Sequence, residues 1–190
     1  MKIRGHAAVF DSQSENLGGF VEIIAPGAFT ESLAQDDVVL LNGHDSRQPL
    51  ARMSAGNLTL REDDKGLFFE ADLPDTSGGR DLHRLVADGV LRSMSFGFTI
   101  EQAADESFKE GCNGLLIRRL RRIRLMEISP VTWPAYPAST VSAAGDTIRA
   151  ARSAPAPRKA KAVPIGQARA KRLREKLEAS QRSCIIYGLR

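Results

Sequence analysis

The chain has 190 residues, 42% of them hydrophobic and 26% charged, which is ordinary for a globular protein and too apolar for a wholly disordered one. No stretch approaches the roughly 20 uninterrupted apolar residues of a membrane helix, and the first six residues lack the apolar run of a secretory signal, so we expect a cytoplasmic protein. The net charge is +4, and the two cysteines, Cys112 and Cys184, form no metal-binding or redox motif and no expected disulfide.

Residues 1–145 predict a mainly β domain with peripheral helices, of the α+β class and barrel-like in form. Alternating Leu58 and Leu60 are typical of a strand with one buried face, whereas Leu82, Leu85 and Val86 have helical spacing. In chain order we expect a strand around His6, a helix over 26–33, a strand over 38–41, two strands joined by a polar turn over 57–73, a helix over 80–88 ending at Gly89, and an extended segment over 115–128.

The first candidate for chemistry is His44, which follows the predicted strand over 38–41. Histidine is the side chain best suited to general-base catalysis near neutral pH, and Gly43 would leave room around the imidazole. A solvent-facing turn residue is the alternative. His83 is expected on the exposed face of its helix, and His6 has no acid or nucleophile beside it in the sequence.

The second candidate is Ser95 in the segment 90–100, which predicts a strand with the apolar residues from Met94 to Ile100 on one face and the small residues from Ser93 to Thr99 on the other. A serine becomes a nucleophile when a neighbouring base takes its proton. Gly97, on the same face, would let a substrate backbone approach, which makes Ser95 a better candidate than Ser93. The alternative is an ordinary strand face of small residues.

The third candidate is Glu127, a carboxylate inside the apolar run 125–128. Such a carboxylate must be paired or hydrogen-bonded, because burying it alone costs several kcal/mol. Its partner could be an imidazole, as in a catalytic triad, or one of the five arginines between Arg118 and Arg124 in a structural ion pair. Sequence alone leaves both open, and these arginines could equally assist electrostatically or form a solvated strand.

The last part of the chain differs sharply in charge. Residues 1–145 hold 15 Lys and Arg against 20 Asp and Glu, whereas residues 146–190 hold 12 against 3. The Ala-, Pro- and cation-rich segment 146–163 predicts a linker, and 164–190 predicts a basic helical tail in which Leu173 and Leu177 share one face. A solvated helix is one interpretation of this tail; docking onto an acidic partner or nucleic acid is the other.

Five segments, taken together and in their order along the chain, resemble one known family. This combination is more specific than any one of the motifs alone. The segments are GHAAVFD over 5–11, IAPGAF over 24–29, NGHD over 42–45, GVLRSMSFGF over 89–98 and EISPVTWPAYP over 127–137. Over residues 3–143, this pattern resembles the HK97-type prohead serine proteases of tailed bacteriophages and prophages.

The resemblance implies a β-barrel surrounded by helices, related to the herpesvirus assembly proteases. It also implies a serine endopeptidase that cuts capsid scaffolding segments inside the immature head in the bacterial cytoplasm, and often cuts itself. Its histidine falls on His44, its serine on Ser95 and its acidic position on Glu127. No cofactor, metal or membrane is expected; the partners would be the scaffolding segment of the major capsid protein and other subunits of an oligomer, with nucleic acid contacted only through the tail.

Two other classes of function remain open from the sequence. One is a noncatalytic capsid-assembly or scaffolding protein on a degenerate protease fold. The other is a nucleic-acid-binding module driven by the tail, whose charge balance of +9 would give salt-sensitive binding without sequence preference. The tail could also be a docking segment for acidic scaffold, or an extension removed by self-cleavage near the linker.

Overall fold

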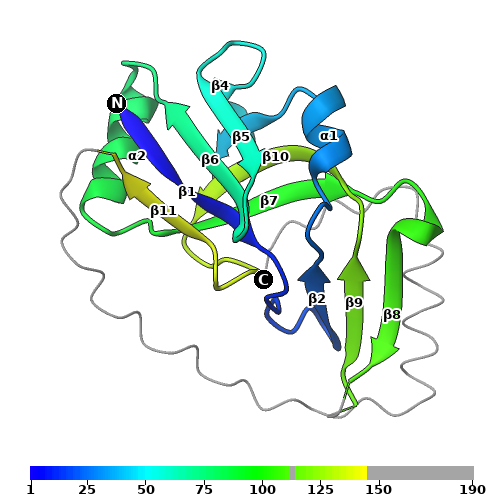
Figure 1. The fold of residues 1–190 in the computed structure, drawn as a ribbon. Helices are drawn as coiled ribbons and strands as arrows, with labels where there is room; N and C mark the ends of the chain where they lie inside the picture. The colour runs from blue at the N-terminus through cyan, green and yellow to red at the C-terminus, as the bar shows by residue number, and fades with distance from the viewer. Residues whose placement is uncertain (112–113, 145–190) are drawn as a thin grey trace.

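The structure is a computed structural model that describes residues 1–111 and 114–144 (Figure 1). Both cysteines, the predicted linker over 146–163 and the predicted helical tail over 164–190 lie outside the described residues.

Strands are the commonest secondary structure of the described residues. The first six strands are β1 (Lys2–Val9), β2 (Phe20–Ile24), β3 (Val39–Asn42), β4 (Asp45–Arg52), β5 (Leu58–Glu62) and β6 (Gly66–Asp72). The remaining strands are β7 (Ser93–Thr99), β8 (Glu106–Glu110), β9 (Leu116–Leu120), β10 (Arg124–Val131) and β11 (Thr140–Ala143). The helices are α1 (Thr30–Gln35), α2 (Ser77–Ala87) and the single 3₁₀ turn η1 (Ala103–Asp105).

The strands form three sheets, with the orders β11-β1-β6-β5, β4-β3-β10-β7 and β2-β9-β8. In Figure 1, α1 and α2 lie at the periphery and the three-stranded sheet projects at the lower right. The prediction of a mainly β fold with peripheral helices is confirmed. Within the described residues, the strands are distributed over these sheets and form no single closed barrel.

The predicted hairpin over 57–73 corresponds to β5 and β6. Leu60 lies opposite Phe69 in the register of the pair, and Leu58, Leu60 and Phe69 are buried as the alternation requires. The predicted strand over 38–41 is β3, shifted by one residue. In both places, the alternation or run of apolar residues located the strand correctly.

The expectation of one extended segment over 115–128 is wrong. The chain breaks at 121–123 into β9 and β10, which belong to different sheets. The backbone N–H groups of Arg121 and Arg122 both donate to the carbonyl of Asp105, and that of Ile123 donates to the carbonyl of Ala28. These long-range bonds turn the chain where local sequence favours extension.

The two predicted helices exist with different bounds. Residues 26–29 form a turn before α1, and α2 begins three residues earlier than expected, capped by the Thr76 hydroxyl that accepts from the Gly79 N–H. Helix α2 ends at Ala87, and Gly89 follows its cap Asp88 with a φ of +71°, a conformation that glycine adopts readily. Leu82 and Val86 are buried, whereas Leu85 is exposed.

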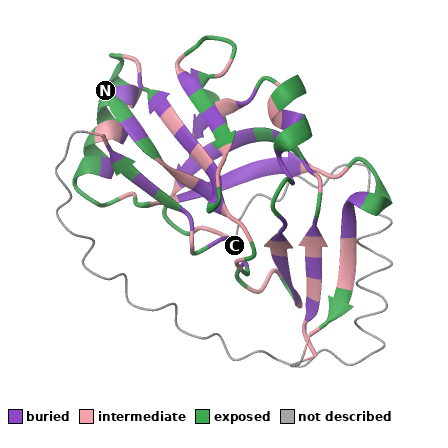
Figure 2. Cartoon of the chain, viewed as in Figure 1, coloured by how far each residue is buried: buried purple, intermediate pink, exposed green. Residues whose placement is uncertain are grey.

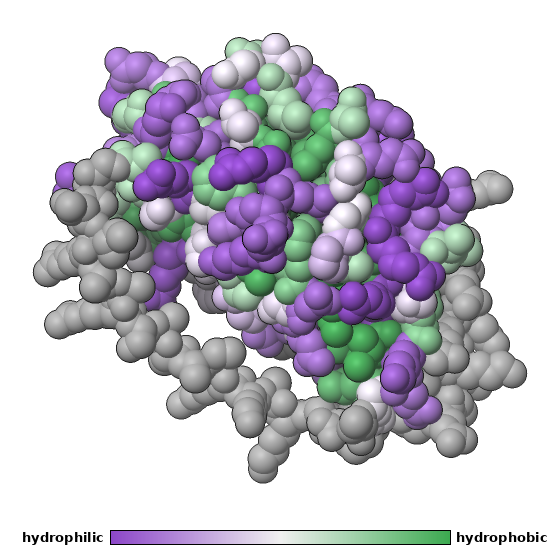
Figure 3. Space-filling model, in the orientation of Figure 1, coloured by the Kyte–Doolittle hydropathy of each residue, from purple (hydrophilic) through white to green (hydrophobic). Residues whose placement is uncertain are grey.

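The core lies between the two four-stranded sheets. Figure 2 shows burial concentrated on the central strands β7 and β10, and the largest buried side chains include Phe29, Phe69, Met94 and Ile128. On the face drawn in Figure 3, hydrophilic residues predominate, with a hydrophobic patch over the three-stranded sheet at the lower right. None of the helices in the described part is long and apolar enough to cross a membrane.

Candidate active site

His44 lies at the tip of the hairpin that joins β3 to β4. Asn42 pairs with Asp45, so only Gly43 and His44 form the loop, and both have positive φ values, +60° and +64°. Two central residues with positive φ are typical of the type I′ turn, whose twist matches that of the flanking strands. Glycine therefore serves the turn geometry here, and the turn projects the imidazole towards β10.

The imidazole meets a carboxylate on β10. The distance from His44 Nδ1 to Glu127 Oε1 is 2.8 Å, and the two side chains are only 12% and 11% exposed. The prediction that Glu127 needs a polar partner is thus confirmed, and within the described residues that partner is the imidazole rather than an arginine. The Ser129 hydroxyl donates to the second carboxylate oxygen at 2.6 Å and accepts the backbone N–H of His44 at 3.0 Å.

Ser95 lies on the neighbouring strand, β7. In the antiparallel register, Ser95 is opposite Ser129 and Gly97 is opposite Glu127. Because side chains two residues apart share a face of a strand, all four positions lie on the same side of the sheet. The other side carries Phe96 and its neighbours into the core, as predicted. Ser95 and Glu127 therefore share one face of this pair of strands, and His44 contacts Glu127.

Gly97 has a different role from the expected one. A Cβ atom at Gly97 would lie 2.6 Å from Glu127 Oε1 and within 3.3 Å of two further Glu127 atoms. The space that the sequence suggested for a substrate backbone is thus filled by the carboxylate. Glycine is required here because a side chain at this position would overlap the Glu127 carboxylate, whose Oε1 also contacts His44.

A second serine holds the backbone next to Ser95. The Ser139 hydroxyl donates to the carbonyl of Met94 at 2.6 Å and accepts its N–H at 3.0 Å. Ser139 is buried, so these bonds satisfy both backbone groups on the side of β7 that faces away from β10. They fix the strand one residue before the candidate nucleophile.

The other histidines do not join this site. His6 on β1 is hydrogen-bonded through Nε2 to the carboxylate of Asp63, in the turn between β5 and β6, at 2.9 Å. The sequence did not suggest this contact. Desolvation would raise the pKa of Asp63, but the bond to His6 and two backbone N–H bonds outweigh it and lower that pKa. His83 is half-buried on α2 rather than fully exposed.

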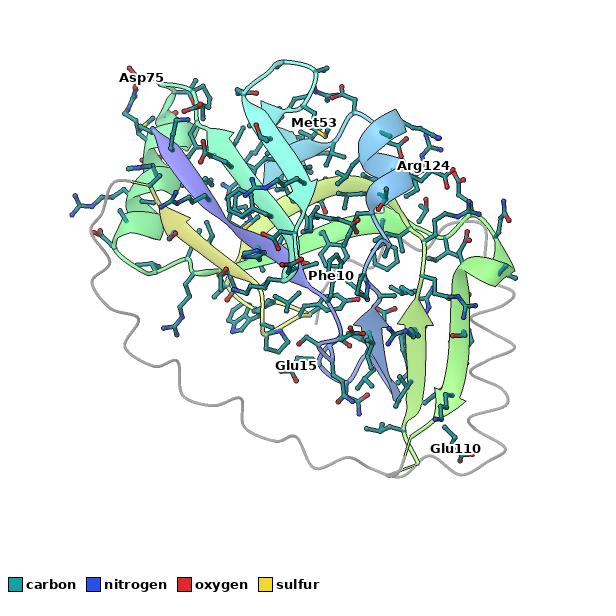
Figure 4. All side chains as sticks on the ribbon, viewed as in Figure 1. Phe10, Glu15, Met53, Asp75, Glu110 and Arg124 are labelled. Carbon is teal, nitrogen blue, oxygen red and sulfur yellow. The ribbon has the colours of Figure 1, made fainter. Side chains whose placement is uncertain are left out.

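The arginines between 118 and 124 are ion-paired or hydrogen-bonded elsewhere. Arg124, labelled beside α1 in Figure 4, pairs with Asp36 and Glu101, and Arg122 pairs with Glu31 and Asp105. These side chains line a cavity of about 170 Å³ at the start of β10. The expectation of electrostatic assistance from this stretch has no support in these contacts.

Arg118 forms the centre of a buried network in the three-stranded sheet. Its guanidinium donates to Glu22 Oε1 at 2.7 Å and also to Glu106, and the Tyr136 hydroxyl donates to Glu22 Oε2 at 2.7 Å. Complete burial, assisted by Glu106, raises the pKa of Glu22, although Arg118 and Tyr136 oppose that rise. Burial and the nearby Glu22 carboxylate raise the pKa of Tyr136 well above its usual value.

Sequence reasoning missed Ser129 and Ser139. Ser129 stands two residues after Glu127, so the period of a strand already placed it on the same face, and that signal could have identified it. Ser139 gave no such signal, since its contact with Met94 spans 45 residues. No group of three or more His, Cys, Asp and Glu side chains that could hold a metal ion occurs in the described part of the chain.

An imidazole bonded to a carboxylate, next to a strand that carries serines, is the set of side chains that serine hydrolases use. The chain belongs to the caudovirus prohead serine protease family, whose model matches residues 1–153. Membership implies a serine protease of the capsid-maturation type from a bacteriophage. None of the curated proteins compared with the chain matches it.

Proposed function

We propose that the chain is a serine endopeptidase that cleaves capsid scaffolding segments inside the immature phage head, with Ser95 as nucleophile, His44 as general base and Glu127 as the group that orients the imidazole. The observation that carries this proposal is the 2.8 Å contact between His44 Nδ1 and Glu127 Oε1, on the same side of the sheet as Ser95. Family membership supports the reaction class.

In this mechanism, Nδ1–H of His44 donates to Glu127, which assigns the base to the other ring nitrogen, Nε2. Nε2 takes the Ser95 proton as the serine oxygen attacks the peptide carbonyl, and then gives it to the departing amine. A water molecule, deprotonated by the same nitrogen, hydrolyses the acyl-enzyme and restores Ser95. Glu127 stabilises the imidazolium in both steps, and backbone amides would stabilise the oxyanion by about 3–4 kcal/mol per donor.

Co-expression with the major capsid protein of the same phage or prophage tests the proposal. The wild-type chain should shorten the capsid protein, whereas Ser95→Ala and His44→Ala should leave it intact. Ser93→Ala is the matched control, since Ser93 lies on the same face of β7 at its start, opposite Val131 rather than Ser129. Cleavage that survives Ser95→Ala would contradict the proposed nucleophile, and a folded wild type without any cleavage would favour a noncatalytic assembly protein.

We also propose that the chain cuts itself near the predicted linker over 146–163. Intact-mass spectrometry of the wild type beside Ser95→Ala tests this step. Loss of the basic tail in the wild type alone supports self-cleavage. An intact tail in both favours the alternative in which the tail docks onto acidic scaffold.

A further inference from the structure

We propose that Ser129 is a positioning residue that sets both the carboxylate of Glu127 and the backbone of His44. This inference rests on the proposed function and deepens it. The side chain is completely buried, and its hydroxyl acts through the two groups that it bonds.

The first argument is the division of the Glu127 carboxylate between two partners. Oε2 accepts the Ser129 hydroxyl at 2.6 Å, and Oε1 lies 2.8 Å from His44 Nδ1. Because the two oxygens are held from different directions, rotation of the carboxylate would break both bonds. The Ser129 bond therefore fixes the direction in which Oε1 faces the ring.

The second argument is the backbone of His44. Its φ of +64° lies in the left-handed region, which residues with a side chain rarely adopt. The hydroxyl oxygen of Ser129 accepts the N–H of this residue at 3.0 Å and so ties the hairpin tip to β10. One hydroxyl thus bonds to the backbone of the base and to the carboxylate, and so fixes their positions relative to each other.

The third argument excludes Ser129 as the nucleophile itself. The hydroxyl has one proton, and that proton is committed to Glu127, while the oxygen accepts a backbone N–H rather than contacting the ring in these bonds. Ser95, the proposed nucleophile, is directly opposite Ser129 on β7. The two serines are therefore assigned different tasks, reaction at Ser95 and support at Ser129.

The test measures kcat and KM for cleavage of the purified capsid protein by Ser129→Ala, with the active enzyme counted by titration with diisopropyl fluorophosphate. We expect kcat to fall about 10- to 100-fold, as the loss of a hydrogen bond to a charged group predicts. KM should change less than about 2-fold, because a completely buried hydroxyl cannot contact substrate. Ser129→Thr, which keeps the hydroxyl, should recover most of kcat.

Ser32→Ala is the matched control. The buried Ser32 hydroxyl has the same two kinds of partner: it donates to the Asp36 carboxylate at 2.8 Å and accepts the N–H of Leu125, also on β10. Its loss should lower the melting temperature as much as Ser129→Ala does while leaving kcat within about 2-fold of the wild type. Equal loss of kcat in both variants would overturn the proposal, since a general loosening of β10 would then explain it.

Failure of this inference is distinguishable from failure of the proposed function. If Ser95→Ala abolishes cleavage while Ser129→Ala keeps the wild-type kcat, the positioning role is wrong and the protease assignment stands. If Ser95→Ala cleaves normally, the proposed function fails, and the role of Ser129 fails with it. If Ser129→Ala does not fold, a folded Ser129→Thr decides: near-normal kcat supports the role, and a 10-fold loss contradicts it.

Discussion

Two buried carboxylates in this molecule are held in opposite ways. Glu127, in the sheet β4-β3-β10-β7, is bonded to an imidazole and a serine hydroxyl, and its side chain is 11% exposed. Glu22, in the three-stranded sheet, is bonded to a guanidinium and a phenol and is completely buried. Both carboxylates are paired, as burial requires, but their partners differ in whether they can gain and lose a proton near neutral pH.

The partner decides whether a buried pair can take part in proton transfer. A guanidinium does not release its proton in proteins, so Arg118 cannot serve as an acid or a base for Glu22, and the ion pair holds the sheet together. An imidazole gains and loses a proton near neutral pH, so the His44–Glu127 pair is the one suited to chemistry. Substitutions at the His44–Glu127 pair should therefore lower activity, whereas substitutions in the Arg118 network should lower stability.

Glu127→Gln should give the largest effect on activity. An amide cannot stabilise the imidazolium and can hold the ring in the wrong tautomer, so we expect kcat for capsid-protein cleavage to fall by about 10³- to 10⁴-fold. The measurement is cleavage kinetics with the purified capsid protein. Glu22→Gln is the control and should keep kcat within about 3-fold once corrected for the folded fraction; a similar loss in both would remove the distinction between the regions.

Arg118→Met should give the largest effect on stability. It leaves Glu22 and Glu106 buried without their cation, and breaking a buried ion pair in this way costs about 3–5 kcal/mol. Urea unfolding followed by circular dichroism measures the free energy of unfolding. Arg119→Met is the matched control, because Arg119 pairs with Asp11 at the surface, where an ion pair contributes at most about 1 kcal/mol. Equal losses would contradict the structural role of the network.

Gly97→Ala should affect the first region more moderately. The new methyl group would lie 2.6 Å from Glu127 Oε1, so the carboxylate must shift and its contact with His44 would be disturbed. We expect a fall in kcat of about 10- to 100-fold, the range for a misplaced catalytic group. The same exchange at Gly78, on α2, meets only Leu50 at 3.8 Å and should leave kcat unchanged while stabilising the helix by about 0.5–1 kcal/mol. Normal kcat in Gly97→Ala would show that the position of the carboxylate is not critical.

Local patterns predicted the parts of this fold that depend on neighbours in sequence. The strand with Ser95, the strand before His44 and the hairpin over 57–73 follow from alternation and turn residues. The partner of Glu127 could not be chosen, since His44 is 83 residues away and five arginines are nearer in the chain. Only the fold shows that those arginines pair elsewhere.

The role of Ser129 depends on its contact with the hairpin tip, 85 residues away in the chain. The role of Gly97 depends on the register between β7 and β10. That register shifts between Leu125 and Glu127, so counting along either strand does not place one residue opposite another. The break of the expected segment over 115–128 has the same kind of cause, because bonds to the carbonyls of Asp105 and Ala28 turn the chain. Long-range contacts, rather than propensity, decided each of these points.

The pH dependence of stability offers the last comparison, since a pKa that differs between the native and unfolded states makes the free energy of unfolding depend on pH. The pKa of Glu22 is raised in the native protein by burial, so its contribution is largest below about pH 4.5 and falls as the pH rises through the native pKa. The deficit in unfolding free energy of Glu22→Gln should therefore be greater at pH 5 than at pH 8. Asp37 has the opposite sign, because bonds from Arg52 and Ser54 lower its pKa to about 2, and the deficit of Asp37→Asn should shrink as the pH falls from 4 to 2. A deficit of Glu22→Gln that is constant with pH would mean that Arg118 fully compensates the burial of Glu22.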